Sequence, residues 1–88
     1  MNTIGIIGAG QMGGGIAHVC ALAGFDVKLS DVSEDQLAKA RDTIDQNMER
    51  QVKHDRITAA DKAAALARIA MGTDYSLFLG CDVIIESA

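Results

Sequence analysis

The feature that most constrains the fold is the turn Gly8-Ala9-Gly10-Gln11-Met12-Gly13, which joins the apolar run Ile4 to Ile7 to a helical pattern. Gly8 allows a tight turn, Gly10 lets the backbone approach a pyrophosphate, and Gly13 lets the helix lie close to the strand. The positive end of the helix dipole points at the same place. A G-x-G-x-x-G pattern alone is weak evidence in a chain with nine glycines. Its context therefore decides what it means.

The segments on either side of the turn have the context that the pattern requires. Thr3 to Ile7 predicts a short buried strand at the centre of a sheet. From Met12 onward, apolar residues at positions 12, 16, 19, 20 and 23 predict one face of a helix. Gly24 is a natural residue to end that helix. The chain thus begins as strand, glycine turn and helix.

A second strand follows and ends at an aspartate. Phe25 to Ser30 alternates apolar and polar residues, which predicts a strand less buried than the first. Asp31 comes next, close to the distance at which a dinucleotide-binding unit places the carboxylate that accepts hydrogen bonds from the adenosine ribose. The alternatives are that Asp31 caps the next helix in competition with Ser33, and that tight packing alone explains the glycines. The combination favours a dinucleotide site.

The remaining elements are predicted from capping signals and periodicity. A capping box at Ser33 to Gln36 opens a long helix that reaches about Lys53. A second start at Thr58 with Asp61 opens an antiparallel helix through the alanine-rich run to Ala70. The apolar stripe of the long helix consists of Leu37, Ala40, Ile44, Met48 and Val52. Last come a strand near 69–73, a helical turn at about 76–79 and a buried strand at 82–86.

This order predicts an α/β fold with a Rossmann-like open parallel sheet of four strands and a helical-hairpin insertion. Right-handed crossovers give the strand order 3-2-1-4. Ligands are expected in the crevice where the order reverses, between the first and fourth strands. Because the chain has no proline, low-complexity stretch or repeat, we expect residues 1–88 to form a single dinucleotide-binding domain.

Composition argues against several other functions. The net charge is −4 and lysines and arginines are not clustered, so nucleic acid is not an expected partner. No apolar run is long enough to cross a membrane and no signal sequence opens the chain, so we expect a cytoplasmic protein. Cys20 and Cys81 belong to no C-x-x-C pair, which suggests neither metal nor redox chemistry. Cys20 is expected in the core.

Few other side chains suggest chemistry. His18 lies off the predicted apolar stripe and His54 lies in a connection, so both are expected to be solvated. Glu86 is a possible acid or base beside a cofactor, but a carboxylate that ends a strand is more often solvated or structural. We expect three methionines to fill the core: Met12, Met48 and Met71.

With these motifs in place, the sequence resembles the beginning of a 3-hydroxyacyl-CoA dehydrogenase, in particular the bacterial 3-hydroxybutyryl-CoA type. The resemblance covers essentially the whole chain. The matching stretches are residues 4–13, 15–17, 24–27, 29–33 and 82–88.

The resemblance implies NAD as cofactor and oxidation of a 3-hydroxyacyl-CoA to the 3-ketoacyl-CoA, or the reverse, in fatty acid and butanoate metabolism. Independently of family, a carboxylate at Asp31 with no arginine after it favours NAD over NADP. FAD stays possible on the motif alone. The implied site residues are Gly8, Gly10 and Gly13 for the pyrophosphate, Gln11 and Met12 beside it, Asp31 for the ribose, and the backbone of Glu86, Ser87 and Ala88 at the nicotinamide side.

The resemblance also implies what this chain lacks. The family's catalytic histidine and glutamate, and the helical domain that binds acyl-CoA and forms the dimer, lie downstream of Ala88. We therefore predict no catalytic residue here, expect acyl-CoA contacts only through that missing part, and expect the natural protein to continue. One alternative is a non-catalytic Rossmann unit that forms homo-oligomers through the exposed edge of strand 82–86. Another is the start of a related NAD-dependent hydroxyacid dehydrogenase.

Overall fold

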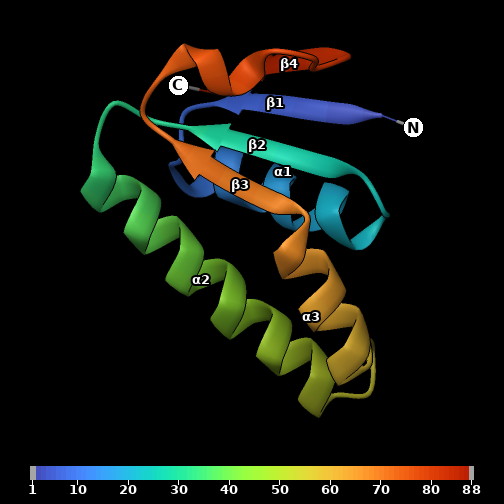
Figure 1. Ribbon diagram of the computed structural model, residues 1–88. Coiled ribbons are helices and arrows are strands. Elements are labelled where there is room, and N and C mark those ends of the chain that lie inside the picture. Colours follow the sequence, from blue (N-terminus) through green and yellow to red (C-terminus); the bar gives the residue numbers. More distant parts are fainter. Residues whose placement is uncertain (1, 88) are drawn as a thin grey trace.

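The computed structural model describes residues 2–87, which form a four-stranded parallel sheet with the order β3-β2-β1-β4 (Figure 1). The predicted α/β class and strand order are confirmed. In chain order the elements are β1 (Thr3–Ile7), α1 (Gln11–Leu22), β2 (Asp26–Ser30), α2 (Glu34–Lys53), α3 (Ala59–Ala67), β3 (Ile69–Gly72), the 3-10 turn η1 (Tyr75–Phe78) and β4 (Val83–Glu86).

The register of the sheet brings three strand ends together. β1 pairs in parallel with β2 on one side and with β4 on the other. Ile7, the last residue of β1, lies beside Ser30 of β2 and beside Glu86 of β4. The segments that follow these strands, including the glycine turn and Asp31, therefore start from the same edge of the sheet.

The three helices gather on one side of the sheet, and η1 lies against the other. α1 contacts both α2 and α3, while η1 contacts β2 and β3. The helices α2 and α3, which connect β2 to β3, form a hairpin whose far end projects away from the sheet (Figure 1). On the η1 side the Phe78 ring lies so close to Gly5 that a Cβ there would come within 2.6 Å of it. Gly5, a weak strand former, is therefore explained by packing.

The buried face of α1 differs from the predicted one. Its buried residues are small and apolar: Gly13, Gly14, Ala17 and Ala21. Met12 and Val19, placed on the predicted apolar stripe, are 68% and 67% exposed. Small side chains let the helix axis come close to the strands and to α2, so close packing, and not side-chain size, selects the inner face here.

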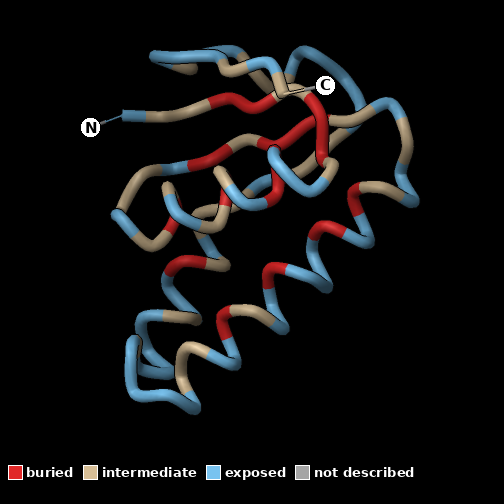
Figure 2. Tube along the Cα trace, turned by 180° about the vertical axis from the view of Figure 1, so that it is seen from behind, coloured by how far each residue is buried: buried red, intermediate tan, exposed pale blue. Residues whose placement is uncertain are grey.

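The two strands beside β1 also differ from prediction. β2 was predicted to be less buried than β1, yet Val27, Leu29 and Ser30 are essentially inaccessible. β2 lies between β1 and β3 and beneath α1, which explains its burial. β4 was predicted to be buried, but Val83 and Ile84 are each 52% exposed. The buried residues accordingly lie in β1, β2 and the inner helix faces, not in β4 (Figure 2).

The long helix has most of the predicted buried face, with Val52 half-buried, but only half of the predicted capping box, because the Ser33 N–H donates to Asp31 and not to Gln36. Leu37, Ala40, Ile44 and Met48 form its buried face. The Ser33 hydroxyl accepts a hydrogen bond from the Gln36 N–H at 3.2 Å, which caps the first turn.

The partner helix α3 starts as predicted and ends earlier. The Thr58 hydroxyl and the Asp61 carboxylate form a reciprocal capping box. The helix ends at Ala67 and not at Ala70, because Ala70 pairs with Lys28 in the sheet. Lys62 ties α3 to α2 through ion pairs with Asp45 at 2.6 Å and Glu49 at 3.0 Å. Between residues 2 and 87 no helix has the length and apolarity that crossing a membrane requires.

Candidate functional site

The first glycine of the turn is required by backbone conformation. Gly8 has φ of +100°, in the left-handed region that side chains disfavour. Its N–H donates to the Ser30 carbonyl at 2.7 Å, which fastens the turn to the end of β2. The role predicted for Gly8, a tight exit from the strand, is the one that this geometry supports.

The third glycine is required by packing. A Cβ on Gly13 would lie 1.8 Å from the Gly8 carbonyl oxygen, which is a backbone atom and cannot rotate away. The same Cβ would lie 2.6 Å from the Ser87 hydroxyl oxygen. The first turn of α1 therefore rests directly on the glycine turn and on the residue that follows β4.

The middle glycine differs from the other two, because no contact among residues 2–87 requires it. Gly10 has φ of −71°, which any residue adopts, and the nearest atom to a Cβ there is Gln36 Nε2 at 3.9 Å. Gly10 is also the N-cap of α1, and the first N–H bonded within the helix is that of Gly14, to the Gly10 carbonyl at 2.9 Å. The preceding N–H groups have no acceptor within the helix. This is open space beside N–H groups that have no acceptor within the helix, as an anion site needs.

The side chains of Gln11 and Met12 both lie exposed at this helix start. Their backbone N–H groups belong to the first turn of α1, directly after the N-cap Gly10.

Asp31 is held at the end of β2 by two backbone donors. Its Oδ2 accepts the Ala9 N–H and its Oδ1 accepts the Ser33 N–H, both at 2.9 Å. These hydrogen bonds, the one from Ala9 first, hold the pKa of the carboxyl below its ordinary value of 3.8, against a smaller opposing effect of desolvation. Ser33 and not Asp31 caps α2. An ionised carboxylate has about four acceptor positions, so two bonds leave room for ribose hydroxyls.

The end of β4 lies on the other side of the turn. Glu86 is exposed. Ser87 is half-buried, and its hydroxyl donates toward the carbonyl oxygens of Ile7 and Gly8, each at 3.0 Å. The prediction for Ala88 falls outside the described residues. The two predicted residues that can be described thus flank the glycine turn opposite Asp31.

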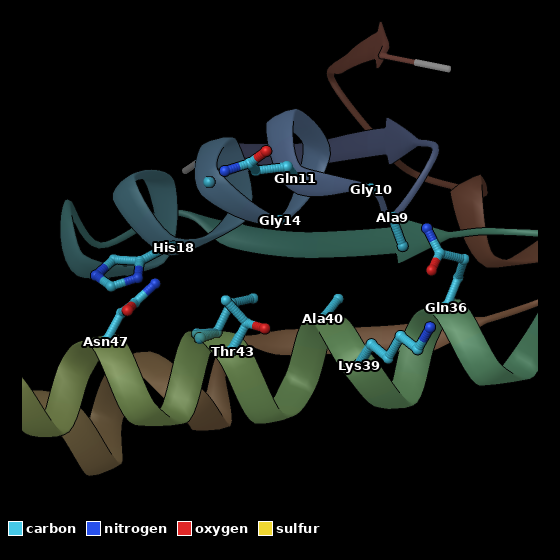
Figure 3. Close-up of a pocket in the computed structure, with 12 residues that line it drawn as sticks. Ala9, Gly10, Gln11, Gly14, His18, Gln36, Lys39, Ala40, Thr43 and Asn47 are labelled. Carbon is cyan, nitrogen blue, oxygen red and sulfur yellow. The ribbon is translucent and has the colours of Figure 1, made fainter.

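A cavity of about 490 Å³ opens between α1 and α2 and reaches the glycine turn from the side of α2. Ala9 and Gly10 border one end and His18 and Asn47 the other (Figure 3). Its wall also includes Gln11, Gly14, Gly15, Gln36, Lys39, Ala40, Thr43 and Ile44. Asp31, Ser87 and Gly13 are not part of this wall, so the cavity adjoins the predicted dinucleotide crevice without coinciding with it.

His18 was predicted to be solvated, and this is wrong. It is half-buried, and its Nε2 lies 2.7 Å from Gln51 Oε1, so the imidazole joins α1 to α2. Periodicity missed it because the second helix covers a side of α1 that its own apolar residues do not mark. His54 is exposed, as predicted.

The cysteines and acidic side chains of residues 2–87 are not grouped as a metal site would require. Cys20 is half-buried and packs against the core, and Cys81 is half-buried near Gly5. Across residues 2–87 no three His, Cys, Asp or Glu side chains gather in a way that could hold a metal ion.

Comparison with known proteins identifies the family. The sequence profile described as "3-hydroxyacyl-CoA dehydrogenase, NAD binding domain" matches residues 3–88. The chain belongs to the 3-hydroxyacyl-CoA dehydrogenase family. Among its relatives is a 3-hydroxybutyryl-CoA dehydrogenase of Bradyrhizobium diazoefficiens, 51% identical over 88 residues, which are 100% of this chain and 30% of that protein.

Solved structures support the same family. The chain is similar to the (S)-3-hydroxybutyryl-CoA dehydrogenase of Ralstonia eutropha, with a TM-score of 0.96 and 42% identity over 100% of this chain and 31% of that one. A lactate dehydrogenase from Cryptosporidium parvum is less similar, with a TM-score of 0.63 and 25% identity over 99% of this chain and 25% of that one. The alternative of a different hydroxyacid dehydrogenase is thus disfavoured. The chain spans less than a third of the length of these relatives.

In this 3-hydroxyacyl-CoA dehydrogenase family the matched segment is the NAD-binding domain, and NAD is the cofactor that the profile names. The residues present fit that cofactor. Open space at Gly10 and the N–H groups at the start of α1, which have no acceptor within the helix, suit a pyrophosphate, while the ionised Asp31 suits ribose hydroxyls.

Proposed function

We propose that the protein carrying this chain transfers a hydride between NAD and C3 of a 3-hydroxyacyl-CoA, with 3-hydroxybutyryl-CoA as the substrate class. The observation that carries the proposal is the family match over residues 3–88, together with 51% identity to a 3-hydroxybutyryl-CoA dehydrogenase. NAD, when bound, supplies the carbon that accepts the hydride. The residues of this chain bind and orient that cofactor. A cytoplasmic location and a place in butanoate or fatty acid metabolism stay predictions from the sequence.

Each predicted site residue that the structure describes has a role in this proposal. The turn from Gly8 to Gly13 receives the pyrophosphate, with the N–H groups at the start of α1 as donors. Asp31 accepts hydrogen bonds from the adenosine ribose. The open space at Gly10 and the two spare acceptor positions of Asp31 support these assignments. The backbone at Glu86 and Ser87 borders the nicotinamide side, supported by its position across the turn from Asp31.

The same geometry favours NAD over NADP. The Asp31 carboxylate is ionised at neutral pH, since the ordinary pKa of 3.8 already lies far below 7 and the Ala9 and Ser33 N–H groups lower the pKa further. A 2′-phosphate placed there would meet a like charge. The next residue, Val32, is largely exposed and offers no positive charge to compensate.

The cavity between α1 and α2 is the proposed contact of this chain with the acyl-CoA. Its wall carries amide, hydroxyl and ammonium groups from Asn47, Thr43 and Lys39, which suit the amides and phosphates of coenzyme A. It adjoins the glycine turn, so a substrate there would approach the cofactor. The sequence predicted acyl-CoA contacts only beyond this chain, and this proposal adds α2 to them.

We also propose self-association through the edge of β4 that no other strand among residues 2–87 covers. The strand pairs on one side with β1, and Val83 and Ile84 are half-exposed. Unpaired strand edges with apolar side chains recruit other chains. Sedimentation at rising concentration tests this, and a strictly monomeric profile would count against it.

The experiment that tests the main proposal is turnover of (S)-3-hydroxybutyryl-CoA with NAD by the full-length protein, followed by NADH absorbance. We expect turnover with NAD and at least about ten-fold lower kcat/KM with NADP. Asn47→Ala should raise the KM for the acyl-CoA and leave that for NAD unchanged, with Gln46→Ala, on the exposed face of α2, as the matched control. Absence of turnover by a protein that binds NADH would refute the proposed substrate class.

A further inference from the structure

The first peptide group of the glycine turn, between Ile7 and Gly8, is held at both of its ends. Its carbonyl oxygen accepts the Ser87 N–H at 2.8 Å and lies 3.0 Å from the Ser87 hydroxyl. Its N–H, that of Gly8, donates to the Ser30 carbonyl at 2.7 Å. Because a peptide group is planar, bonds at both ends fix its orientation.

The next peptide group, between Gly8 and Ala9, is held in the same way. Its carbonyl oxygen lies 3.0 Å from the Ser87 hydroxyl, and its N–H donates to Asp31 Oδ2 at 2.9 Å. In both peptide groups the end of β2 holds the N–H and Ser87 holds the carbonyl. The Ser87 hydroxyl is therefore shared between two consecutive carbonyl oxygens.

Ser87 also touches the start of the helix. Its hydroxyl oxygen would lie 2.6 Å from a Cβ on Gly13, so it packs where α1 meets the turn. The N–H groups that follow the two fixed peptides are those at the start of α1, which have no acceptor within the helix. Their direction depends on the two peptide groups that precede them.

The geometry points to Ser87 as a positioning residue for the NAD pyrophosphate. Its hydroxyl does not touch the cofactor in this role. It holds the Ile7 and Gly8 carbonyls in place, so that the helix-start N–H groups are oriented before the pyrophosphate arrives. This rests on the NAD-binding role of the domain and goes beyond the prediction that the Ser87 backbone borders the nicotinamide side.

Ser87→Ala in the full-length protein tests the proposal. It removes the hydroxyl and keeps the backbone N–H bond to Ile7. We expect the Kd for NADH and for ADP to rise about three- to ten-fold, the range of one net hydrogen bond, and the Kd for adenosine, which has no phosphate, to stay unchanged. The KM for NADH should rise while kcat and the KM for the acyl-CoA stay within about two-fold. Ser76→Ala, at an exposed serine in η1, is the matched control and should change none of these.

The outcomes separate a positioning role from a structural one. Unchanged NADH and ADP affinities, an equal loss for adenosine and ADP, or a variant that no longer folds would each overturn the proposal. If the parent protein binds NADH without oxidising 3-hydroxybutyryl-CoA, the proposed substrate class fails, and a selective loss of ADP affinity in Ser87→Ala still supports the positioning role.

Discussion

The strands β2 and β4 flank β1, run in the same direction and end at the same edge of the sheet, but they differ in how far their residues are buried. β2 is buried at Val27, Leu29 and Ser30, and the aspartate that follows it is fixed by two backbone N–H groups. β4 has no buried residue, and its last residue, Glu86, is exposed (Figure 2).

This difference in burial separates two halves of the proposed cofactor site, one for the adenosine and pyrophosphate and one for the nicotinamide. The residues proposed for the adenosine ribose and the pyrophosphate are fixed by contacts among β1, β2 and α1, together with the hydrogen bonds of Ser87 to the Ile7 and Gly8 carbonyls. Those proposed for the nicotinamide side lie at the end of an open strand. We therefore infer that the adenosine and pyrophosphate half is complete in this chain.

The largest expected effect on stability and on NADH binding is at Gly13, in the adenosine and pyrophosphate half of the site. Gly13→Ala puts a Cβ 1.8 Å from a backbone oxygen and should destabilise the fold by about 3 kcal/mol or more and abolish NADH binding. Thermal unfolding measures the loss. Gly15→Ala, where no atom lies within 4 Å of the new Cβ, is the matched control and should stabilise by up to about 1 kcal/mol. Equal stabilities of the two variants would contradict the packing argument.

A substitution at Gly10 should weaken NADH binding strongly while changing the stability of the fold little. Gly10→Ala meets no atom of the chain closer than 3.9 Å and suits the backbone, so we expect a stability loss below about 1 kcal/mol, from the altered N-cap. The added methyl group occupies the proposed pyrophosphate position, so the Kd for NADH should rise at least about 30-fold. A fluorescence titration with NADH measures this Kd for the variant and for the wild type. Wild-type affinity would mean that the pyrophosphate lies elsewhere.

Asp31→Asn should weaken NADH binding about ten-fold, because charge-assisted hydrogen bonds to the ribose are lost. It should also lower stability at neutral pH, since the carboxylate accepts two backbone N–H groups. The folded-state pKa lies below the ordinary 3.8. The stabilising contribution is therefore complete above 3.8 and is lost as the pH falls through the folded-state value.

The check for this pH dependence is denaturant unfolding of wild type and Asp31→Asn across acidic pH. Asp42→Asn, at an exposed position of α2, serves as the control. A stability difference between wild type and Asp31→Asn that grows as the pH falls below 3.8 would refute the assignment.

The smallest effect on the stability of the fold is expected in β4, on the nicotinamide side of the site. Ile84→Thr keeps a β-branched residue in β4 and should cost less than about 1 kcal/mol, because the side chain is already half-exposed. It should reduce self-association of this chain measured by sedimentation velocity. If association is as strong as in the wild type, the β4 edge is not the contact.

The sequence was sufficient for the parts of the fold that depend on local chemistry. The start and the buried residues of α2 were predicted correctly, because a capping residue and periodicity report directly on one element. The strand order was predicted correctly because right-handed crossovers leave few arrangements of these elements. The spacing of Asp31 from the turn predicted its neighbourhood, though not its bonds to Ala9 and Ser33.

The errors about burial have one physical cause, which is that burial depends on neighbours that a single element does not encode. Met12 and Val19 looked like core residues, but glycine and alanine form the close contact of α1. β4 looked buried because it is apolar, and nothing among the described residues covers Val83 and Ile84 fully. His18 looked solvated, but α2 lies against it.

The most direct test of the central claim compares NADH with ADP-ribose, which has the adenosine and the pyrophosphate and no nicotinamide, as ligands of this chain. If the adenosine and pyrophosphate half is complete here and the nicotinamide half is open, the two Kd values should agree within about three-fold. An affinity for NADH more than about ten-fold above that for ADP-ribose would contradict the account.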